Sequence, residues 1–397
     1  MAVFSDTSTT TLAYAAEAVF GTAPATGYQL VRFSGESMNI SIESAKSEEI
    51  DSSRQYTGSV QVSGSASGDL NFQLSYGEYD DFLLAVLQDD AWDAGYSDVV
   101  TEIGADNLCT VTSTTGLKVG TIVKLLGLGA SGDDGVYTVK KINSSTTFTT
   151  EETLTVEAAT GTGTATNSGA IQNGVTNHSF AFEKKFVNEG SSHYFLLTGM
   201  RCGSMNMSLS TGSVMSGSFA FTGTGGTASE DSAESGSYSA AGANELMNSV
   251  SNVDNLTLYS VAADGTTTAM AATFQDFSLT VDNQLREQAA VGSLYAAGIG
   301  SSRIMVEASA TIYFTNRDLF TQFIVNGDVQ LRWQLTDEKD DYGNRYGFCI
   351  PQAKVASHEV VASGPDADIV ANVSFYAVKD VLSGTTSSIL ISRIASV

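Results

Sequence analysis

Residues 38–88 decide the fold, because they lay out a strand, a polar turn, a long alternating strand and a helix in the order MNISIE, SEEIDSSRQY, SVQVSGSASGDLNFQLSY and EYDDFLLAVLQ. Residues 277–325 repeat that order as FSLTVD, NQLREQAAVGSLY, SRIMVEASATIYF and TNRDLFTQFIV. The repetition continues after each helix, where residues 179–200 resemble residues 330–351 and a short strand follows, GSFAF or NVSFYA. The sequence therefore predicts two copies of one strand-rich module in a single chain.

The composition indicates a folded, mainly β protein. The chain has 397 residues, of which 42% are hydrophobic, and 38 glycines against 3 prolines suit strands joined by glycine-rich turns. Acidic residues outnumber Lys and Arg by 44 to 19, which gives a formal net charge of −25. Such a charge repels phosphate backbones and anionic lipid, so we expect neither sequence-specific nucleic-acid binding nor a membrane partner.

Shifts in composition divide the chain into six parts. We expect an amino-terminal arm, a discontinuous first module, a small inserted β-domain, a mobile surface linker, a second module and a carboxy-terminal tail, at residues 1–25, 26–92 with 175–225, 93–174, 226–253, 254–380 and 381–397. The insertion holds short alternating strands, LCTV, IVKLL, VYTVKKI and TFTT, typical of a barrel or sandwich of four to six strands. Its Gly/Ser/Thr/Ala-rich flanks indicate linkers, so we expect it to project outward and to be removable.

Each module contains one predicted amphipathic helix. In the first helix Asp80 and Asp81 stand at the start, where the helix dipole favours negative charge. The apolar residues expected to cover one side of each sheet are Phe82, Leu83, Val86 and Leu87 in the first helix and Leu319, Phe320, Phe323 and Ile324 in the second.

Catalytic and ligand-binding patterns are missing from the sequence. It has no P-loop, HExxH, GxSxG or dinucleotide motif, and its three cysteines stand far apart. The acidic runs GDDG at 132–135 and DEKDDYGN at 337–344 do not space enough oxygens for calcium, and we interpret them as hairpin turns. We therefore predict a protein that is not an enzyme and that binds no cofactor or metal.

Three stretches, TLAYAAEAVFGTAP, SGESMNISIESAKSEEIDSSRQY and SGDLNFQLSYGEYDDFLLAVL, resemble the tail tube (major tail) proteins of long-tailed bacteriophages (siphoviruses). The resemblance implies a β-sandwich or barrel flanked by a helix, a hairpin that docks on adjacent subunits, and rings stacked into a hollow tube for DNA ejection. It implies a virion protein, assembled in the host bacterial cytoplasm, with a tape measure protein, a tail terminator and tail-tip or baseplate proteins as partners. The insertion at about 95–170 departs from the family unit. A common member has one module and six copies per ring, so two modules would suit a trimer with pseudo-six-fold symmetry.

Two sets of residues are candidates for function on this interpretation. The polar turn after the first strand is expected to form an inter-subunit hairpin through Glu48, Glu49, Ile50, Asp51, Arg54 and Tyr56. Acids near the barrel strands are expected to line the lumen and repel DNA, namely Asp69, Glu183, Asp282 and Glu307. Acidic composition serving only solubility is the rival explanation.

Two other functions remain open. The chain could be another β-structural virion protein or a receptor- or carbohydrate-binding tail protein, with the insertion as the binding part. Only Tyr137 and Phe148 are aromatic between residues 101 and 155, too few for a sugar-binding platform. A depolymerase would need paired carboxylates in a groove, and the adjacent Glu48 and Glu49 would point to opposite faces of a strand.

Overall fold

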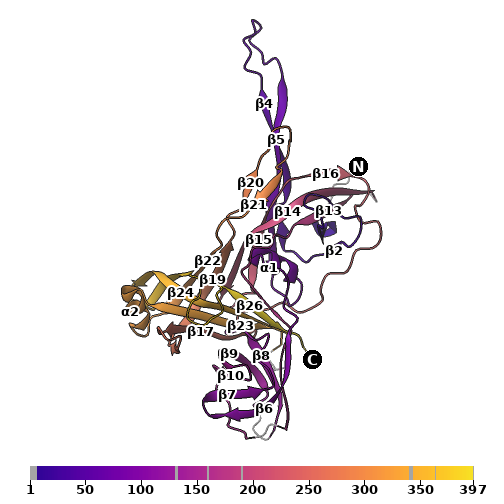
Figure 1. Ribbon diagram of the computed structural model, residues 1–397. Coiled ribbons are helices and arrows are strands. Elements are labelled where there is room, and N and C mark those ends of the chain that lie inside the picture. Colours follow the sequence, from indigo (N-terminus) through magenta and orange to yellow (C-terminus); the bar gives the residue numbers. More distant parts are fainter. Residues whose placement is uncertain are drawn as a thin grey trace.

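The computed structural model describes residues 7–129, 133–158, 161–188, 191–338, 343–362 and 364–396. Parts of the two acidic runs, Gly132 and residues 339–342, lie outside the described residues, as do the first six residues of the arm and the last of the tail. The predicted mainly β fold is confirmed (Figure 1). A long hairpin projects at one end of the molecule, a small barrel stands at the other, and the two modules lie between them (Figure 1).

One continuous antiparallel sheet, here called the long sheet, runs through both modules. Its strands, in spatial order, are β3 (Gly35–Glu36) with β4 (Asn39–Lys46), β5 (Ser59–Gln73), β15 (Ser216–Gly223), the second half of β14 (Ser191–Ser210), β19 (Thr273–Asp282), β22 (Met305–Tyr313), β25 (Val370–Ala377) and the second half of β24 (Arg345–Val361). Alternation along these strands puts apolar side chains on one face, where they form the main core.

A cover sheet in each module closes the other side of that core. In the first module it contains β2 (Gln29–Leu30), β1 (Thr11–Ala16), β13 (Phe180–Asn188), the first half of β14 and β16 (Gly225–Ser229). In the second it contains β18 (Thr267–Met270), β17 (Val253–Val261), β23 (Asp328–Thr336), the first half of β24, β26 (Leu390–Ile394) and β12 (Ala170–Gln172). Thus a strand of the amino-terminal arm and a strand of the carboxy-terminal tail are built into the cover sheets.

The two modules have the same strand topology. The pairing series β4, β5, β15, β14, β13, β1 of the first module matches β19, β22, β25, β24, β23, β17 of the second. A register irregularity interrupts β14 between Cys202 and Ser204 and β24 between Val355 and Ser357, so these positions correspond. The registers also make Ile40 equivalent to Val281, two residues from the sequence match of MNISIE with FSLTVD. An even shift keeps every side chain on its face.

The first helix, α1 (Asp80–Leu87), buries its predicted apolar face completely. Phe82 lies among the core aromatics, with its ring centre 4.6 Å from that of Tyr14. The second helix, α2 (Asp318–Val325), forms as predicted but buries none of its residues. Phe320 is 44% exposed and Ile324 is 65% exposed, whereas Leu319 and Phe323 are partly buried against the main core, so only half of the predicted face covers its own sheet.

The helices also differ in their place relative to the junction between the modules. Residues 204–210 of β14 pair with residues 276–282 of β19, and the buried Asn283 then donates from Nδ2 to the Val86 carbonyl, 2.8 Å away. At its other end α1 contacts the second module through the carboxylate of Asp80, which accepts from Tyr346 and pairs with Arg393. The apolar face of α1 packs in its own module, where Phe82 meets Phe180, Phe219 and Phe221, and the second module adds polar contacts at both ends of the helix. The helix α2 lies at the end of the chain's own sheet, far from this junction (Figure 1).

A closed six-stranded barrel is inserted after α1. Its order is β10 (Thr147–Thr150), β7 (Leu108–Val111), β6 (Tyr96–Gly104), β11 (Gly161–Asn167), β8 (Ile122–Leu128) and β9 (Gly135–Ser144). The barrel has a separate core that includes Val123, Leu125, Val139 and Phe148. Two short 3-10 turns complete the regular structure, η1 (Thr7–Thr9) and η2 (Ala105–Asn107).

The barrel rests on the cover sheet of the second module through buried polar contacts. Arg332 Nη1 lies 3.2 Å from Glu151 Oε2, and Gln334 Nε2 donates to Thr138 Oγ1 over 3.1 Å. The side chains of β23 are therefore buried on both faces, apolar ones in the core and polar ones under the barrel. The flexible flanks expected from the sequence are thus not the sole attachment of the barrel.

The linker expected to be a mobile loop instead covers the outer face of the first module. Glu183 of β13 accepts from Ser232 Oγ at 3.0 Å and from the Ala233 amide, and Glu234 accepts from the Tyr28 amide at 2.9 Å. The strands beneath present small residues such as Ala13 and Ala181, which need a covering layer. Glu234 of this segment thus serves as an acceptor for backbone amides, a role that composition does not reveal.

Candidate functional site: a polar sheet face and two open edges

The long sheet turns a second, polar face away from the core. Along each strand every other residue points to this side, and the neighbours across strands match in register. We call these residues the polar face: Ser67, Asp69, Asn71, Ser218, Ala220, Ser204, Asn206, Ser208, Asp276, Ser278, Thr280, Asp282, Glu307, Ser309, Thr311, Asn372, Ser374, Ser357 and Glu359. A shallow groove of about 330 Å³ runs over its second-module half.

Three of the four candidate lumen acids lie on the polar face. Asp69 is opposite Ala220, Asp282 is opposite Ser204, and Glu307 is opposite Thr280. Glu183 does not belong there, because it is buried on β13 and hydrogen-bonded to the linker.

The polar face also carries Asp276 and Glu359, which the sequence analysis missed. Asp276 could have been found by counting back in twos along the strand that holds Asp282, since side chains alternate with that period. Glu359 follows the irregularity in β24 that shifts the alternation, so only the structure places it.

Two cationic side chains near the ends of these strands, Arg201 and Lys354, have partners outside the polar face. Arg201 donates to the Ile299 carbonyl and lies 4.7 Å from the centre of the Phe20 ring. Lys354 pairs with Asp328 at 3.0 Å and donates to the Asn326 carbonyl at 2.7 Å. The polar face therefore combines uncompensated carboxylates with neutral hydroxyls and amides, a chemistry that repels polyanions without binding them.

Each end of the long sheet is an open edge in the described part of the chain. There β4 pairs with β5 alone, and residues 354–361 of β24 pair with β25 alone. The exposed edge carries apolar side chains, Ile42 on β4 and Val360 on β24. Met207, the counterpart of Val360 at the junction of the two modules, is only 3% exposed because β19 covers it, whereas Val360 is 45% exposed. Unpaired edges of this kind accept a further strand readily.

The candidate hairpin residues are gathered in the turn between β4 and β5, residues 47–58, here called the first elbow (Figure 1). Lys46 lies over the Tyr56 ring at 4.8 Å, Thr57 donates to Glu49 over 2.8 Å, and Asp51 Oδ1 accepts from the Ser53 amide over 2.7 Å. The hydrogen bond from the Ser53 amide lowers the pKa of Asp51. The turn is thus stabilised locally, while Ile50 and Tyr56 remain exposed.

The corresponding turn of the second module, residues 283–304 or the second elbow, docks on the first module. It contains β20 (Arg286–Gln288) and β21 (Gly298–Gly300). The Gly64 amide donates to the Leu294 carbonyl over 2.8 Å, and the Tyr295 ring lies so close that a Cβ on Gly64 would stand 2.7 Å from it. An elbow of this fold therefore packs on the preceding module of the sheet.

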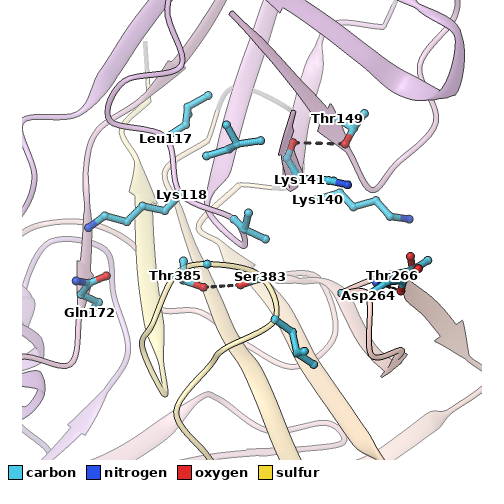
Figure 2. A pocket seen from close by; sticks show the side chains of 15 residues that line it. Leu117, Lys118, Lys140, Lys141, Thr149, Gln172, Asp264, Thr266, Ser383 and Thr385 are labelled. Carbon is cyan, nitrogen blue, oxygen red and sulfur yellow. Dashed lines mark hydrogen bonds between the residues drawn. The ribbon is translucent and has the colours of Figure 1, made fainter. Parts of the chain in front are cut away.

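A pocket of about 530 Å³ lies between the barrel and the second module (Figure 2). Lys118 points toward Gln172, whereas Lys140 and Lys141 extend to the opposite side (Figure 2). Lys118 pairs with Asp93 at 2.8 Å and Lys140 with Glu151 at 3.4 Å. The lysines do not converge on one point, so the pocket shows no assembled anion site.

The described ranges hold neither a metal-binding cluster nor a membrane-spanning helix. No three His, Cys, Asp or Glu side chains gather there to hold a metal ion, and no helix there has the length and apolarity to cross a membrane. The three cysteines are buried and unpaired, and burial raises the pKa of the Cys109 thiol to about 12.

Comparison with known proteins agrees with this geometry. A family model described as phage tail tube protein matches residues 7–377, which span both modules and the barrel between them. No curated protein matches the chain. Members of the family are structural components of the virion that associate into a tube. By this match the chain belongs to the phage tail tube protein family.

Proposed function

We propose that three copies of this chain close a ring in which their six modules alternate, and that the rings stack into a tube for DNA ejection. The main support for the proposal is the junction between β14 and β19, which joins two equivalent modules edge to edge. Because β24 is the counterpart of β14 and β4 the counterpart of β19, the same junction can form between copies. A head-to-tail contact of this kind closes into a ring when the rotation that relates neighbouring copies is a whole fraction of a full turn.

The internal junction supplies the register of the external one. Ser204, Met205 and Asn206 face Asp282, Val281 and Thr280. Transferring these pairs through the equivalent positions puts Ser357, His358 and Glu359 of one copy opposite Ser41, Ile40 and Asn39 of the next. Ring closure would then remove both open edges, which is how closed barrels avoid promiscuous pairing.

In such a ring the polar face lines the channel and the cover sheets face outward. The carboxylates repel the phosphates of passing DNA, so the DNA moves without adhering. By the same proposal the ring stack meets a tape measure protein inside, a tail terminator at one end and tail-tip or baseplate proteins at the other. Assembly takes place in the host cytoplasm, and the protein carries out no catalysis.

Electron cryomicroscopy of purified tubes tests the ring. Three chains per ring with both modules in the wall is the expected result, and six chains per ring, or a module outside the wall, overturns it.

The register has a separate test. Glu359→Cys combined with Asn39→Cys should cross-link neighbouring copies, since the counterpart side chains Asn206 and Thr280 are hydrogen-bonded at 3.1 Å. Pairing Glu359→Cys with Asn71→Cys, which lies on β5 one strand inward from the edge, is the matched control and should not cross-link. If the control pair links as well as the edge pair, the register is wrong.

A further inference from the structure

The second helix packs Leu319 and Phe323 against the core of its own chain but leaves other apolar residues exposed. Phe320, Ile324 and Val325 are all exposed on α2, whereas α1 buries its apolar residues throughout. Both helices have eight residues, and both end at a residue in the left-handed conformation, Gln88 or Asn326. The two helices are therefore equivalent in position but not in environment.

The second module contacts the amino-terminal end of α1, whose apolar face packs in its own module. Tyr346 of β24 donates to Asp80, accepts from the Gly77 amide at 2.8 Å and lies with its ring centre 4.9 Å from that of Tyr76. Its neighbour Phe348 stacks on Trp333 in the same core cluster as α1. The start of a helix in one module thus lies against one aromatic side chain, Tyr346, on the cover sheet of the next, and Phe348 is the next core-facing residue along that strand.

Those two positions have counterparts in the first module. Counting from the corresponding irregularities in β14 and β24, Tyr346 is equivalent to His193 and Phe348 to Phe195. The cross-strand neighbours agree, because Leu335 opposite Tyr346 corresponds to Phe186 opposite His193. Phe348 is buried, whereas Phe195 is 40% exposed.

A hollow of about 350 Å³ opens beside Phe195 in the first module. Ile40, Lys184, Phe186, Phe195 and Leu197 are among the residues that line it. Phe186 and Phe195 meet edge to face with their ring centres 5.6 Å apart. The chain therefore has a helix with exposed apolar residues at one end of its sheet and an uncovered aromatic hollow at the other. The contact between the start of α1 and Tyr346 shows how a helix and a cover sheet of successive modules lie together.

We propose that α2 of one copy seats in this hollow of the next copy. Phe320 and Ile324 then pack against Phe186 and Phe195, and Asp318, which opens α2 as Asp80 opens α1, faces His193. The occupant of both surfaces is a second copy of this chain. This inference rests on the proposed ring and adds a contact to it, namely a helix plug outside the channel wall that supplements the pairing of strand edges.

Replacement of the plug tests the inference. Phe320→Ser with Ile324→Ser removes exposed apolar groups, so the monomer should keep its fold and melting temperature. The critical concentration for assembly should rise at least about tenfold, as expected when apolar anchors at the centre of an interface are lost. Val156→Ser, at an equally exposed position on the barrel, is the matched control and should assemble normally. Normal assembly of the double variant would overturn the plug.

A cross-link locates the contact directly. Asp318→Cys with His193→Cys should give covalently linked chains on a non-reducing gel, and Asp318→Cys alone should not. Rings of three from the wild type without this cross-link would contradict the plug and leave the proposed ring intact. Wild-type rings of six chains would overturn the proposed ring itself, so the two failures are distinguishable.

Discussion

Glu151 offers a sharp test of how the inserted barrel is held. Its carboxylate lies 3.2 Å from the guanidinium of Arg332, and these side chains are 10% and 5% exposed. The guanidinium also stands 5.2 Å from the centre of the Tyr259 ring. Glu151→Ala leaves this buried cation without its carboxylate.

The expected loss of stability is large because only one partner is removed. Breaking a buried ion pair in this way costs about 3–5 kcal/mol, chiefly from the uncompensated charge. Replacing both partners, as in Glu151→Ala with Arg332→Met, removes that charge and should recover most of the loss. Asp93→Ala is the matched control: its pair with Lys118 is 2.8 Å long, but the side chains are 44% and 27% exposed, so about 1 kcal/mol or less is expected.

Differential scanning calorimetry of the unassembled chain is the appropriate assay, because a multi-module protein need not unfold in one step. The transition that includes the barrel and second module should shift down strongly for Glu151→Ala and little for Asp93→Ala. Equal shifts for both single variants, or no recovery in the double variant, would refute the reasoning. The same contacts bear on excision of about residues 92–174, which would expose Arg332 to solvent.

The remaining predictions concern the channel, the first elbow and the tail. Replacing Asp69, Asp282 and Glu307 with Lys should leave tubes intact but slow DNA ejection from phage particles. The effect should be greatest at low salt, where screening is weak. An unchanged ejection rate would show that the charge of the polar face does not affect DNA passage. Deleting residues 47–58 should give a folded chain by circular dichroism that no longer polymerises, and normal tubes would show the elbow to be ordinary surface. Burial raises the pKa of Asp380, but hydrogen bonds from Ser383 and Thr385 outweigh it, so the pKa lies below its usual range. Its stabilisation is therefore present above about pH 4 and is lost as pH falls through the folded pKa, so Asp380→Asn should flatten the acid-unfolding curve; a curve identical to wild type would contradict this.

Local pattern was sufficient wherever a residue's role depends on its near neighbours along the chain. The alternation in SVQVSGSASGDLNFQLSY predicted a strand with one apolar and one polar face, and the structure puts Asp69 of β5 on the face away from the core. The spacing of Phe82 and Val86 likewise predicted α1 and its buried face. The duplication could be recognised in the sequence because the strands and the helix of each copy have the same spacing of apolar residues.

Only tertiary structure decided what depends on partners distant in sequence. Glu183 has the strand position of a candidate lumen acid, yet the linker some fifty residues away buries it through Ser232. The helices α1 and α2 have similar apolar patterns, but Phe82 of α1 is buried among aromatic side chains from distant strands, whereas Phe320 of α2 is 44% exposed. The physical reason is that periodicity specifies the face on which a side chain lies, whereas burial requires a second surface, and the position of that surface is set by the packing of the whole chain.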